Sequence, residues 1–287
     1  MSTSPTLRRM PTYFLSHGGG PWPYLQGPMR ARFALLEAAL KDIPQQLPEQ
    51  PRAVLVVSGH WEEINFTVSS SPNPGMVYDY YGFPEEAYRI RYPAPGSPEL
   101  ATRVSELLSG AGWTVRHDPQ RGFDHGTFSL LTPMYPKADV PIVQLSLKST
   151  LDPEEHFAAG QALASLRDDG ILIIGSGQSY HNLANWGAGN AGNAAVFDGW
   201  LRRTLLRGSP QDRRAELVEW AKAPAARESH PREDHLIPLM VAAGAALDEP
   251  ATCVYGEFLM GMASSSFRFG ADRTPSKFDS LSAAGKR

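Results

Sequence analysis

The chain has 287 residues, of which 42% are hydrophobic and 20% are charged, and its formal net charge at pH 7 is -3. This length and apolar content are sufficient for one large domain with a packed core. Because basic residues are not in excess, we expect neither nucleic acid nor a membrane surface as a partner.

The sequence contains 1 cysteine, Cys253, which excludes an intrachain disulfide and a zinc site held by several cysteines. We therefore expect a reducing, cytoplasmic location. The apolar stretch after Arg8 and Arg9 is too short for a signal-peptide core. No stretch approaches the roughly 20 apolar residues that a membrane span needs. The sequence leaves open whether the protein is a monomer or a homodimer.

Short apolar runs alternate along the chain with segments that carry helix start signals. The runs that predict buried strands are residues 12–15, 53–57, 141–145 and 171–174. Helices are predicted at residues 99–108, 152–166, 194–206 and 211–221. Ser97 and Asp152 are the expected caps of the first two helices, and Glu155 is placed to complete a capping box with Asp152.

This alternation predicts an α/β fold with a central mixed sheet flanked by helices on both faces. We expect a single domain over residues 1–287 with a core of about residues 11–266. Residues 69–95 are rich in proline, glycine and tyrosine and predict a long ordered loop, a kind of segment that often carries function. The polar tail from Gly270 is expected to fray.

Three of the apolar runs lead into a histidine. His17 and His60 follow their runs closely, and His181 follows the fourth run after a few more residues. Because ligands of open α/β sheets bind beyond the carboxyl ends of the strands, these imidazoles are expected to face one crevice. Small residues beside them, such as Gly59 and Gly177, would let backbone and ligand approach closely. Spacing alone leaves the alternative that each histidine is simply packed or hydrogen-bonded.

Imidazole is a ligand for iron, zinc, copper and nickel, and three ligands with open positions are typical of a catalytic metal site. His125 lies between Asp124 and Gly126, and a later segment carries two more histidines. His117 is expected in a surface turn and His156 in a solvated first helical turn, and neither is assigned a function.

At these residues the sequence resembles the class III extradiol ring-cleavage dioxygenases, in the branch of the DOPA 4,5-dioxygenases. The resemblance covers residues 11–266 and rests on seven motifs in order. They are FLSHGGGP (14–21), VVSGHW (56–61), YDYYGFPEEAYRIRYPAPGSPELA (78–101), RGFDHGTF (121–128), MYPKADVPIVQLSL (134–147), GSGQSYHNL (175–183) and HPREDHLIPL (230–239).

The resemblance implies that His17, His60 and His235 hold a metal. It implies that His181 is either a fourth metal contact or an acid/base, and that His125 contacts substrate or O2. Tyr80 and Phe83 are implied to wall the substrate pocket. The implied metal is Fe(II), although Zn(II) can occupy such a site in purified protein, and the implied partners are a small aromatic molecule and O2.

Relatives similar to protocatechuate 4,5-dioxygenase use two histidines and a carboxylate, whereas the third position here is His235, preferred to His230. Glu233 or Asp234 stays open as a carboxylate ligand. The resemblance predicts a metal-dependent enzyme that opens the ring of a catechol-type substrate with O2. The alternatives are a zinc-dependent hydrolase on the same scaffold and a non-catalytic, metal-poor binding protein, which O2 consumption and metal content distinguish.

Overall fold

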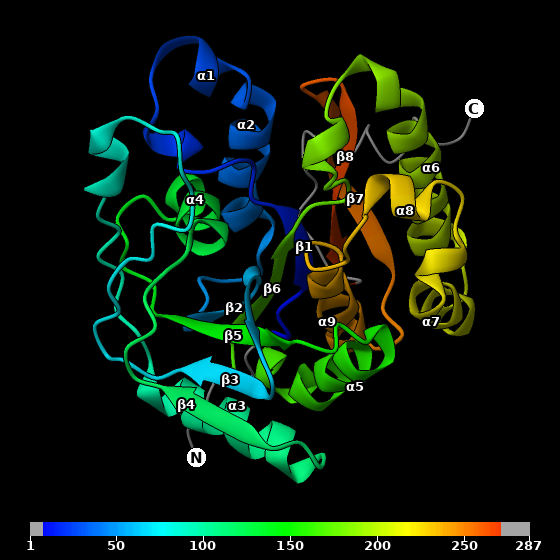
Figure 1. Ribbon diagram of the computed structural model, residues 1–287. Coiled ribbons are helices and arrows are strands. Elements are labelled where there is room, and N and C mark those ends of the chain that lie inside the picture. Colours follow the sequence, from blue (N-terminus) through cyan, green and yellow to red (C-terminus); the bar gives the residue numbers. More distant parts are fainter. Residues whose placement is uncertain (1–7, 271–287) are drawn as a thin grey trace.

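The structure, a computed structural model, describes residues 8–270 and contains one eight-stranded sheet with the strand order β4-β3-β5-β2-β6-β1-β8-β7 (Figure 1). The strands are β1 (Thr12–Ser16), β2 (Ala53–Glu63), β3 (Phe66–Ser69), β4 (Val115–Asp118), β5 (Ile142–Lys148), β6 (Ile171–Gly177), β7 (Ala251–Leu259) and β8 (Met262–Phe269). Strands β5, β2, β6 and β1 are parallel to one another, whereas β8 is antiparallel to β1 and β7 is antiparallel to β8. The mixed sheet confirms the predicted fold class.

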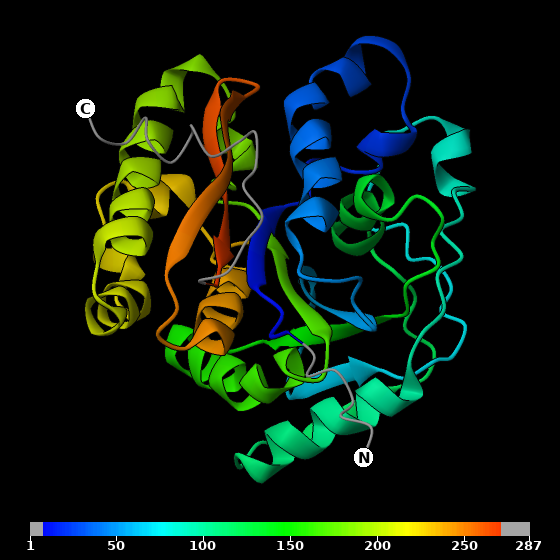
Figure 2. The same cartoon turned by 180° about the vertical axis from the view of Figure 1, so that it is seen from behind.

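Helices cover both faces of this sheet, as predicted. They are α1 (Gly27–Ala31), α2 (Ala34–Asp42), α3 (Pro98–Gly110), α4 (His125–Met134), α5 (Pro153–Leu163), α6 (Ala191–Arg207), α7 (Pro210–Val218), α8 (Ala226–Ser229) and α9 (Ile237–Ala246). Figures 1 and 2 view the molecule from opposite sides, and in both α1, α2 and α4 lie on one side of β1 and β8 while α6, α7 and α8 lie on the other.

Alternate residues of the central strands feed two hydrophobic cores, because successive side chains of a strand point to opposite faces. In β2, Leu55 and Val57 join the core that includes residues of α3, α5 and α9. Val54 and Val56 join the core that includes residues of α2 and α4. The apolar run of β2 is therefore buried on both faces, which explains why it lacks polar alternation.

The predicted helix caps are found, although one detail was wrong. The Ser97 side chain accepts a hydrogen bond from Leu100 N, and the Asp152 side chain accepts one from Glu155 N. The Glu155 carboxylate does not close a capping box, because it binds the side chains of Lys148 and Thr150 instead. The helix after Asp152 is also shorter than predicted: α5 ends at Leu163 and a 3-10 turn follows.

Four strands were not predicted from the sequence, namely β3, β4, β7 and β8. Strand β8 reads MASSSFRF and is buried along its whole length, so neither an apolar run nor a two-residue alternation marks it. His117, expected in a surface turn, lies exposed in β4 at the edge of the sheet. Strand β4 is a short, polar edge strand, and such a strand resembles a turn in a sequence.

The expectation for His156 was wrong, because its side chain is fully buried. Its Nδ1 lies 2.6 Å from the carbonyl oxygen of Asp152, and its Nε2 accepts a hydrogen bond from the backbone N–H of Lys148 at 3.0 Å. Burial lowers the pKa of His156 to about 4. This histidine is a neutral, structural link between α5 and the end of β5.

No helix within residues 8–270 is long and apolar enough to cross a membrane. The tail predicted to fray lies, beyond Gly270, outside the described residues.

Candidate metal centre

Three histidines converge at the carboxyl ends of the parallel strands. His17 follows β1, His60 lies near the end of β2, and His235 comes just before α9. The Nε2 atoms of His17 and His60 are 3.2 Å apart, and those of His60 and His235 are 3.1 Å apart. The structure thus brings together three imidazoles from distant parts of the sequence, since His17 and His235 are 218 residues apart.

Local backbone features aim these side chains. The register of β2 against β5 shifts between Val57 and Glu62, so β2 bulges where His60 lies. Bulges re-aim side chains and are common beside active sites. Gly177 lets the chain before α9 approach closely, because a Cβ there would lie 2.1 Å from the carbonyl oxygen of His235. Gly177 therefore permits a close backbone approach, which is the effect predicted for the small residues beside the histidines.

Two of the imidazoles are oriented by carboxylates. His60 Nδ1 lies 3.2 Å from Asp79 Oδ2, and His235 Nδ1 lies 2.9 Å from Asp234 Oδ2. A carboxylate only accepts hydrogen bonds, so the bond to Asp234 places the proton of His235 on Nδ1. The charge of Asp79 beside Nδ1 of His60 favours the same position there. Burial raises the pKa of Asp234 to about 6, which leaves this carboxylate charged at pH 7. A charged carboxylate, that of Asp234, thus contacts the Nδ1 side of the His235 ring.

His17 is oriented by a hydroxyl relay. Its Nδ1 lies 3.1 Å from Ser176 Oγ, and that hydroxyl donates to the carbonyl oxygen of Gly126 at 2.5 Å. Since the only hydroxyl proton is used on the carbonyl, Ser176 must accept a proton from Nδ1 of His17. Each of the three rings therefore has an acceptor beside Nδ1, and this arrangement favours a proton on Nδ1 and an Nε2 lone pair that faces the common centre.

This arrangement fits a cation. Lone pairs of neutral imidazoles placed 3.1 and 3.2 Å apart repel one another when no proton lies between them. Nitrogen ligands of a divalent transition metal lie about 3.0–3.4 Å apart at tetrahedral or octahedral angles. Burial lowers the pKa of His17, His60 and His235 well below its usual value. The rings are therefore neutral at pH 7, which is the form that binds metals.

Asp79 links this cluster to a fourth histidine and was missed by the sequence reasoning. Its Oδ1 accepts hydrogen bonds from Nδ1 of His125 at 2.8 Å and from the His125 backbone N–H at 3.1 Å, while its Oδ2 faces His60. Burial works against ionisation, but the bonds and charges of His125 and His60 prevail and lower the pKa of Asp79 to about 2. The available signal was a carboxylate between two tyrosines in the loop expected to be functional.

The start of α4 holds His125 in place. Asp124 is the N-cap of α4 and accepts hydrogen bonds from Thr127 N at 3.0 Å and from Ser58 Oγ at 2.9 Å. Arg121 adds an ion pair with Asp124 at 2.7 Å. Since Ser58 belongs to β2, this buried network connects α4 to the strand that carries His60 and fixes the two histidines relative to each other.

His181 lies against the cluster in a different way. Its ring stacks on that of His235 with the centroids 3.4 Å apart and the planes 15° from parallel. Burial, followed by the effect of His125, lowers the pKa of His181 to about 4. One of its ring nitrogens lies within 4.8 Å of a carboxylate oxygen of Asp234 and of a ring nitrogen of His235, whereas His17, His60 and His235 form a separate group of three.

The other candidate metal ligands of this region are His230, Glu233 and Asp234, and each contacts a different group. His230 is buried, and its Nε2 lies 3.1 Å from the carbonyl oxygen of Ser179. Glu233 forms an ion pair with Arg227 at 2.6 Å. Of the two acids left open as ligands, Asp234 therefore contacts His235 and Glu233 faces an arginine.

A cavity of about 640 Å³ opens beside the histidines. His17, His60, His125, His181 and His235 all line it. Tyr80 and Phe83, predicted as pocket walls, line it too, and the loop of residues 69–95 delivers both. The Tyr80 hydroxyl donates to the carbonyl oxygen of Ala87. Gly20 has a φ of +53°, and a Cβ there would meet the Phe83 ring at 2.6 Å, so this glycine makes room for the wall.

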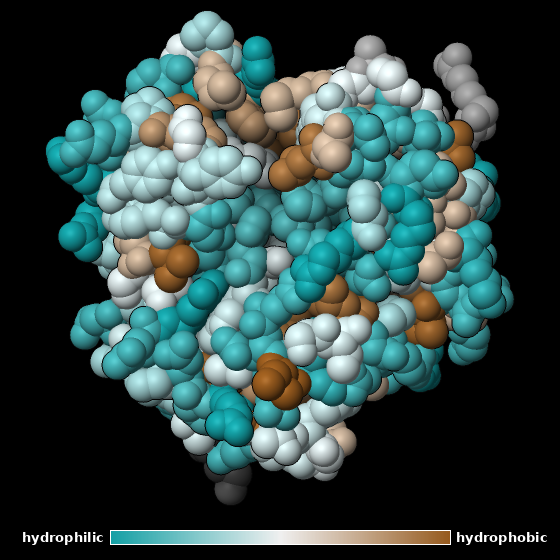
Figure 3. Space-filling model, viewed as in Figure 1, coloured by the Kyte–Doolittle hydropathy of each residue, from teal (hydrophilic) through white to brown (hydrophobic). Residues whose placement is uncertain are grey.

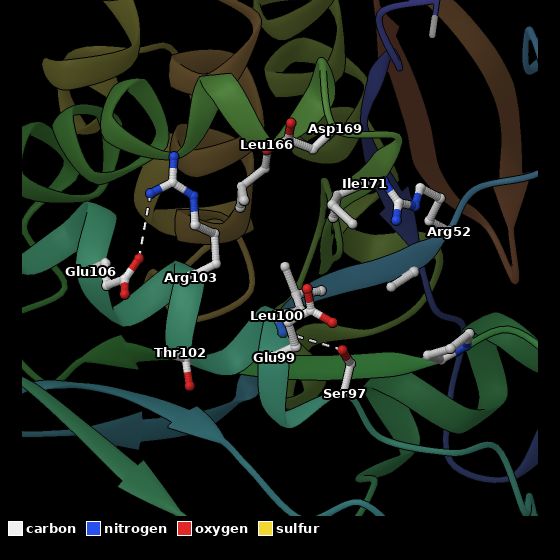
Figure 4. Close-up of a pocket in the computed structure, with 12 residues that line it drawn as sticks. Arg52, Ser97, Glu99, Leu100, Thr102, Arg103, Glu106, Leu166, Asp169 and Ile171 are labelled. Carbon is white, nitrogen blue, oxygen red and sulfur yellow. Dashed lines mark hydrogen bonds and ion pairs between the residues drawn. The ribbon is translucent and has the colours of Figure 1, made fainter. Parts of the chain in front are cut away.

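A second hollow, of about 750 Å³, lies at the opposite end of the sheet (Figure 4). It is bordered by α3 and by the first residues of β2 and β6, Ala53 and Ile171. Its described lining residues include charged side chains such as Arg103 and Glu106 but no histidine or cysteine. The candidate metal ligands are gathered at the carboxyl ends of the strands, where ligands of such sheets bind.

Three imidazoles leave part of the coordination sphere of a cation to the adjoining cavity, and this property separates catalytic metal sites from structural ones. The chain is thus of the class of metal-dependent α/β enzymes. The family model of the catalytic LigB subunit of aromatic ring-opening dioxygenase matches residues 11–266, and the chain belongs to this family. This confirms the predicted resemblance and the prediction of a metal-dependent extradiol dioxygenase.

Curated relatives agree with the family. The chain is 41% identical over 239 residues to a 4,5-DOPA dioxygenase extradiol from Beta vulgaris, covering 82% of this chain and 86% of the relative. It is 36% identical over 241 residues to a protein of the same name from Escherichia coli, strain K12, covering 83% and 85%. The crystal structure of an uncharacterized protein from Escherichia coli K12 has a TM-score of 0.73 at 31% identity and covers 91% of this chain and 100% of that one.

Proposed function

We propose that the protein opens the ring of a catechol-type substrate with O2, beside rather than between the two hydroxyls, and that Nε2 of His17, His60 and His235 hold the metal. The observation that carries this proposal is the convergence of three Nε2 atoms at 3.1 and 3.2 Å, with an acceptor oxygen beside every Nδ1.

The functional metal of this proposal is Fe(II). Ring opening with O2 moves electrons from the catechol to oxygen, and Fe(II) supplies the redox chemistry that connects the two. Zn(II) has no redox chemistry and suits the same imidazoles, so zinc in purified protein would give an inactive form. Three neutral ligands leave the double positive charge uncompensated, which favours binding of the catechol as an anion.

We assign proton transfer to His125 and His181. Because Nδ1 of His125 donates to Asp79 at 2.8 Å, Nε2 is left to take a proton from a substrate hydroxyl in the cavity. His181 lines the same cavity and is neutral near pH 7, so it is suited to accept or return the second proton. Its stacking on His235 supports this acid/base role over that of a fourth ligand.

We assign the walls of the substrate pocket to Tyr80 and Phe83. Their rings meet edge to face with the centroids 5.4 Å apart, and Tyr80 packs in the same way against His125 at 5.9 Å. Such a wall presents ring faces and edges to a flat aromatic substrate and helps to exclude water from it.

The test is O2 uptake by protein reconstituted with Fe(II) without air and then exposed to air with a panel of catechols, DOPA among them. We expect O2 consumption together with a yellow ring-opened product. A hydrolase consumes no O2, and a non-catalytic scaffold purified without chelator is empty of metal. No O2 uptake with any catechol, while metal is bound, would contradict the proposal.

We also place the protein in a reducing cytoplasm, as a monomer or homodimer. Cys253 is a free, buried thiol, which suits such a compartment. Cell fractionation and size-exclusion chromatography test the two parts of this proposal.

A further inference from the structure

We propose that this cavity selects catechols whose ring substituent is uncharged and apolar over catechols that carry a carboxylate near the ring. The inference rests on the proposed function and narrows its substrate class. It comes from the chemistry of the cavity wall beyond the histidines.

The wall away from the histidines is made mostly of aromatic and aliphatic side chains. Phe33, Tyr80 and Leu259 line the cavity and are at least nine-tenths buried. Buried apolar walls favour substituents that leave water readily, because the apolar surface of both partners is removed from water together.

The apolar wall continues outward to the rim of the cavity. Leu183 is 69% exposed and Tyr81 is 92% exposed, and both line the cavity together with Met260. The face in Figure 3 is hollowed, and hydrophobic residues lie beside the hollow. Large apolar side chains that stay exposed around a hollow are typical of a binding surface. The rim therefore offers contact area to a substituent that projects from the ring.

No lysine or arginine is among the described residues that line the cavity. Two basic side chains on the bordering segments have acidic partners: Arg30 pairs with Glu37 at 2.8 Å and Arg121 with Asp124 at 2.7 Å. A substrate carboxylate inside the cavity would thus find no cationic side chain, and burying an anion without one is costly.

The charge balance of the site points the same way. The acid among the described residues that line the cavity is Asp79, whose two carboxylate oxygens face His125 and His60. With a divalent cation in place, a catecholate anion and Asp79 already supply the compensating negative charge. A carboxylate on the ring would be a surplus anion close to Asp79.

The experiment compares two matched pairs of similar size, measured without O2 so that binding is separated from turnover. The first pair is 4-isopropylcatechol and 3,4-dihydroxybenzoate, and the second is 4-isobutylcatechol and 3,4-dihydroxyphenylacetate. Calorimetry on the Fe(II)-loaded protein should give a Kd at least about tenfold lower for the apolar member of each pair. O2 uptake is then measured with all four compounds.

Two variants test whether the cavity wall causes the binding preference. Leu183→Lys adds a cation at the exposed rim and should reduce the preference in the second pair by about tenfold. Val196→Lys is the control, because Val196 is also exposed, at 51%, but does not line the cavity. It should leave the preference unchanged.

Equal or tighter binding of the carboxylates, with O2 uptake intact, would overturn the inference and leave the proposed function standing. An equal change in both variants would overturn it as well, because the cavity wall would not be the cause. The expected binding preference without O2 uptake from any compound would instead overturn the proposed function.

Discussion

Asp79 Oδ1 and His125 Nδ1 lie 2.8 Å apart, and the other oxygen of the same carboxylate faces His60. One side chain from an irregular loop thus lies against Nδ1 of a candidate metal ligand and of a candidate acid/base. Carboxylates behind histidine ligands orient the ring and raise its basicity. Under the proposed function, Asp79 therefore couples metal binding to proton transfer.

The variant Asp79→Asn tests this coupling. An amide has one oxygen acceptor, so it can serve only one of the two Nδ1–H groups and presents a donor to the other. We expect metal affinity to fall by about 10–100-fold and turnover to fall further. Metal titration by competition with a chelator measures the first effect. Glu106→Gln is the control, since Glu106 is an exposed acid of α3; equal losses in both variants would contradict the role of Asp79.

Alanine variants should separate metal binding from proton transfer. His17→Ala and His60→Ala are expected to lose bound metal, because each removes one of three ligands. His125→Ala should keep the metal and lose turnover by about 10²–10⁴-fold. Metal content per chain and O2 uptake are the two measurements. The exposed edge-strand variant His117→Ala should match the unmodified protein in both, and metal loss from His125→Ala would count against the assignment.

Gly177→Ala should disturb the site through the backbone. The new Cβ would lie 2.1 Å from the His235 carbonyl oxygen and 3.0 Å from the Phe14 ring, so the chain before α9 must shift. We expect a loss of stability of about 1–3 kcal/mol in urea unfolding, together with weaker metal binding. Gly199→Ala is the matched control. A Cβ at this α6 position meets nothing within 4 Å, so a helix-interior alanine should be stabilising by about 0.5–1 kcal/mol.

The buried His156 should make stability depend on pH. Burial lowers its pKa from 6.5 to about 4 in the folded state, so the unfolded chain binds a proton first as the pH falls. Its contribution is present above pH 6.5 and is lost between there and pH 4, at up to about 1.4 kcal/mol per pH unit. His156→Asn should flatten the dependence of the unfolding free energy on pH in this range. The variant His117→Asn should not, and equal slopes for His156→Asn and the unmodified protein would contradict the prediction.

The sequence by itself determined the parts of this protein whose signals are local. The run before Ser58 predicts a buried strand because strands covered on both faces need continuous apolar residues. Ser97 and Asp152 start helices because their oxygens accept from N–H groups only three residues away. His17, His60 and His181 could be predicted at one crevice because parallel strands end at the same edge of a sheet.

The tertiary structure decided what depends on contacts between distant segments. Asp79 and Ser176 lie against imidazole nitrogens, yet the local pattern does not show which histidine either residue contacts, because the fold delivers that histidine from elsewhere. The burial of His156 and of the serine-rich strand β8 follows from neighbours that pack over them. The spacing of apolar residues predicts which side chains of a helix or strand are buried only where the surroundings of that element repeat with the period of its side chains. The surroundings of His156 and of β8 do not repeat in this way.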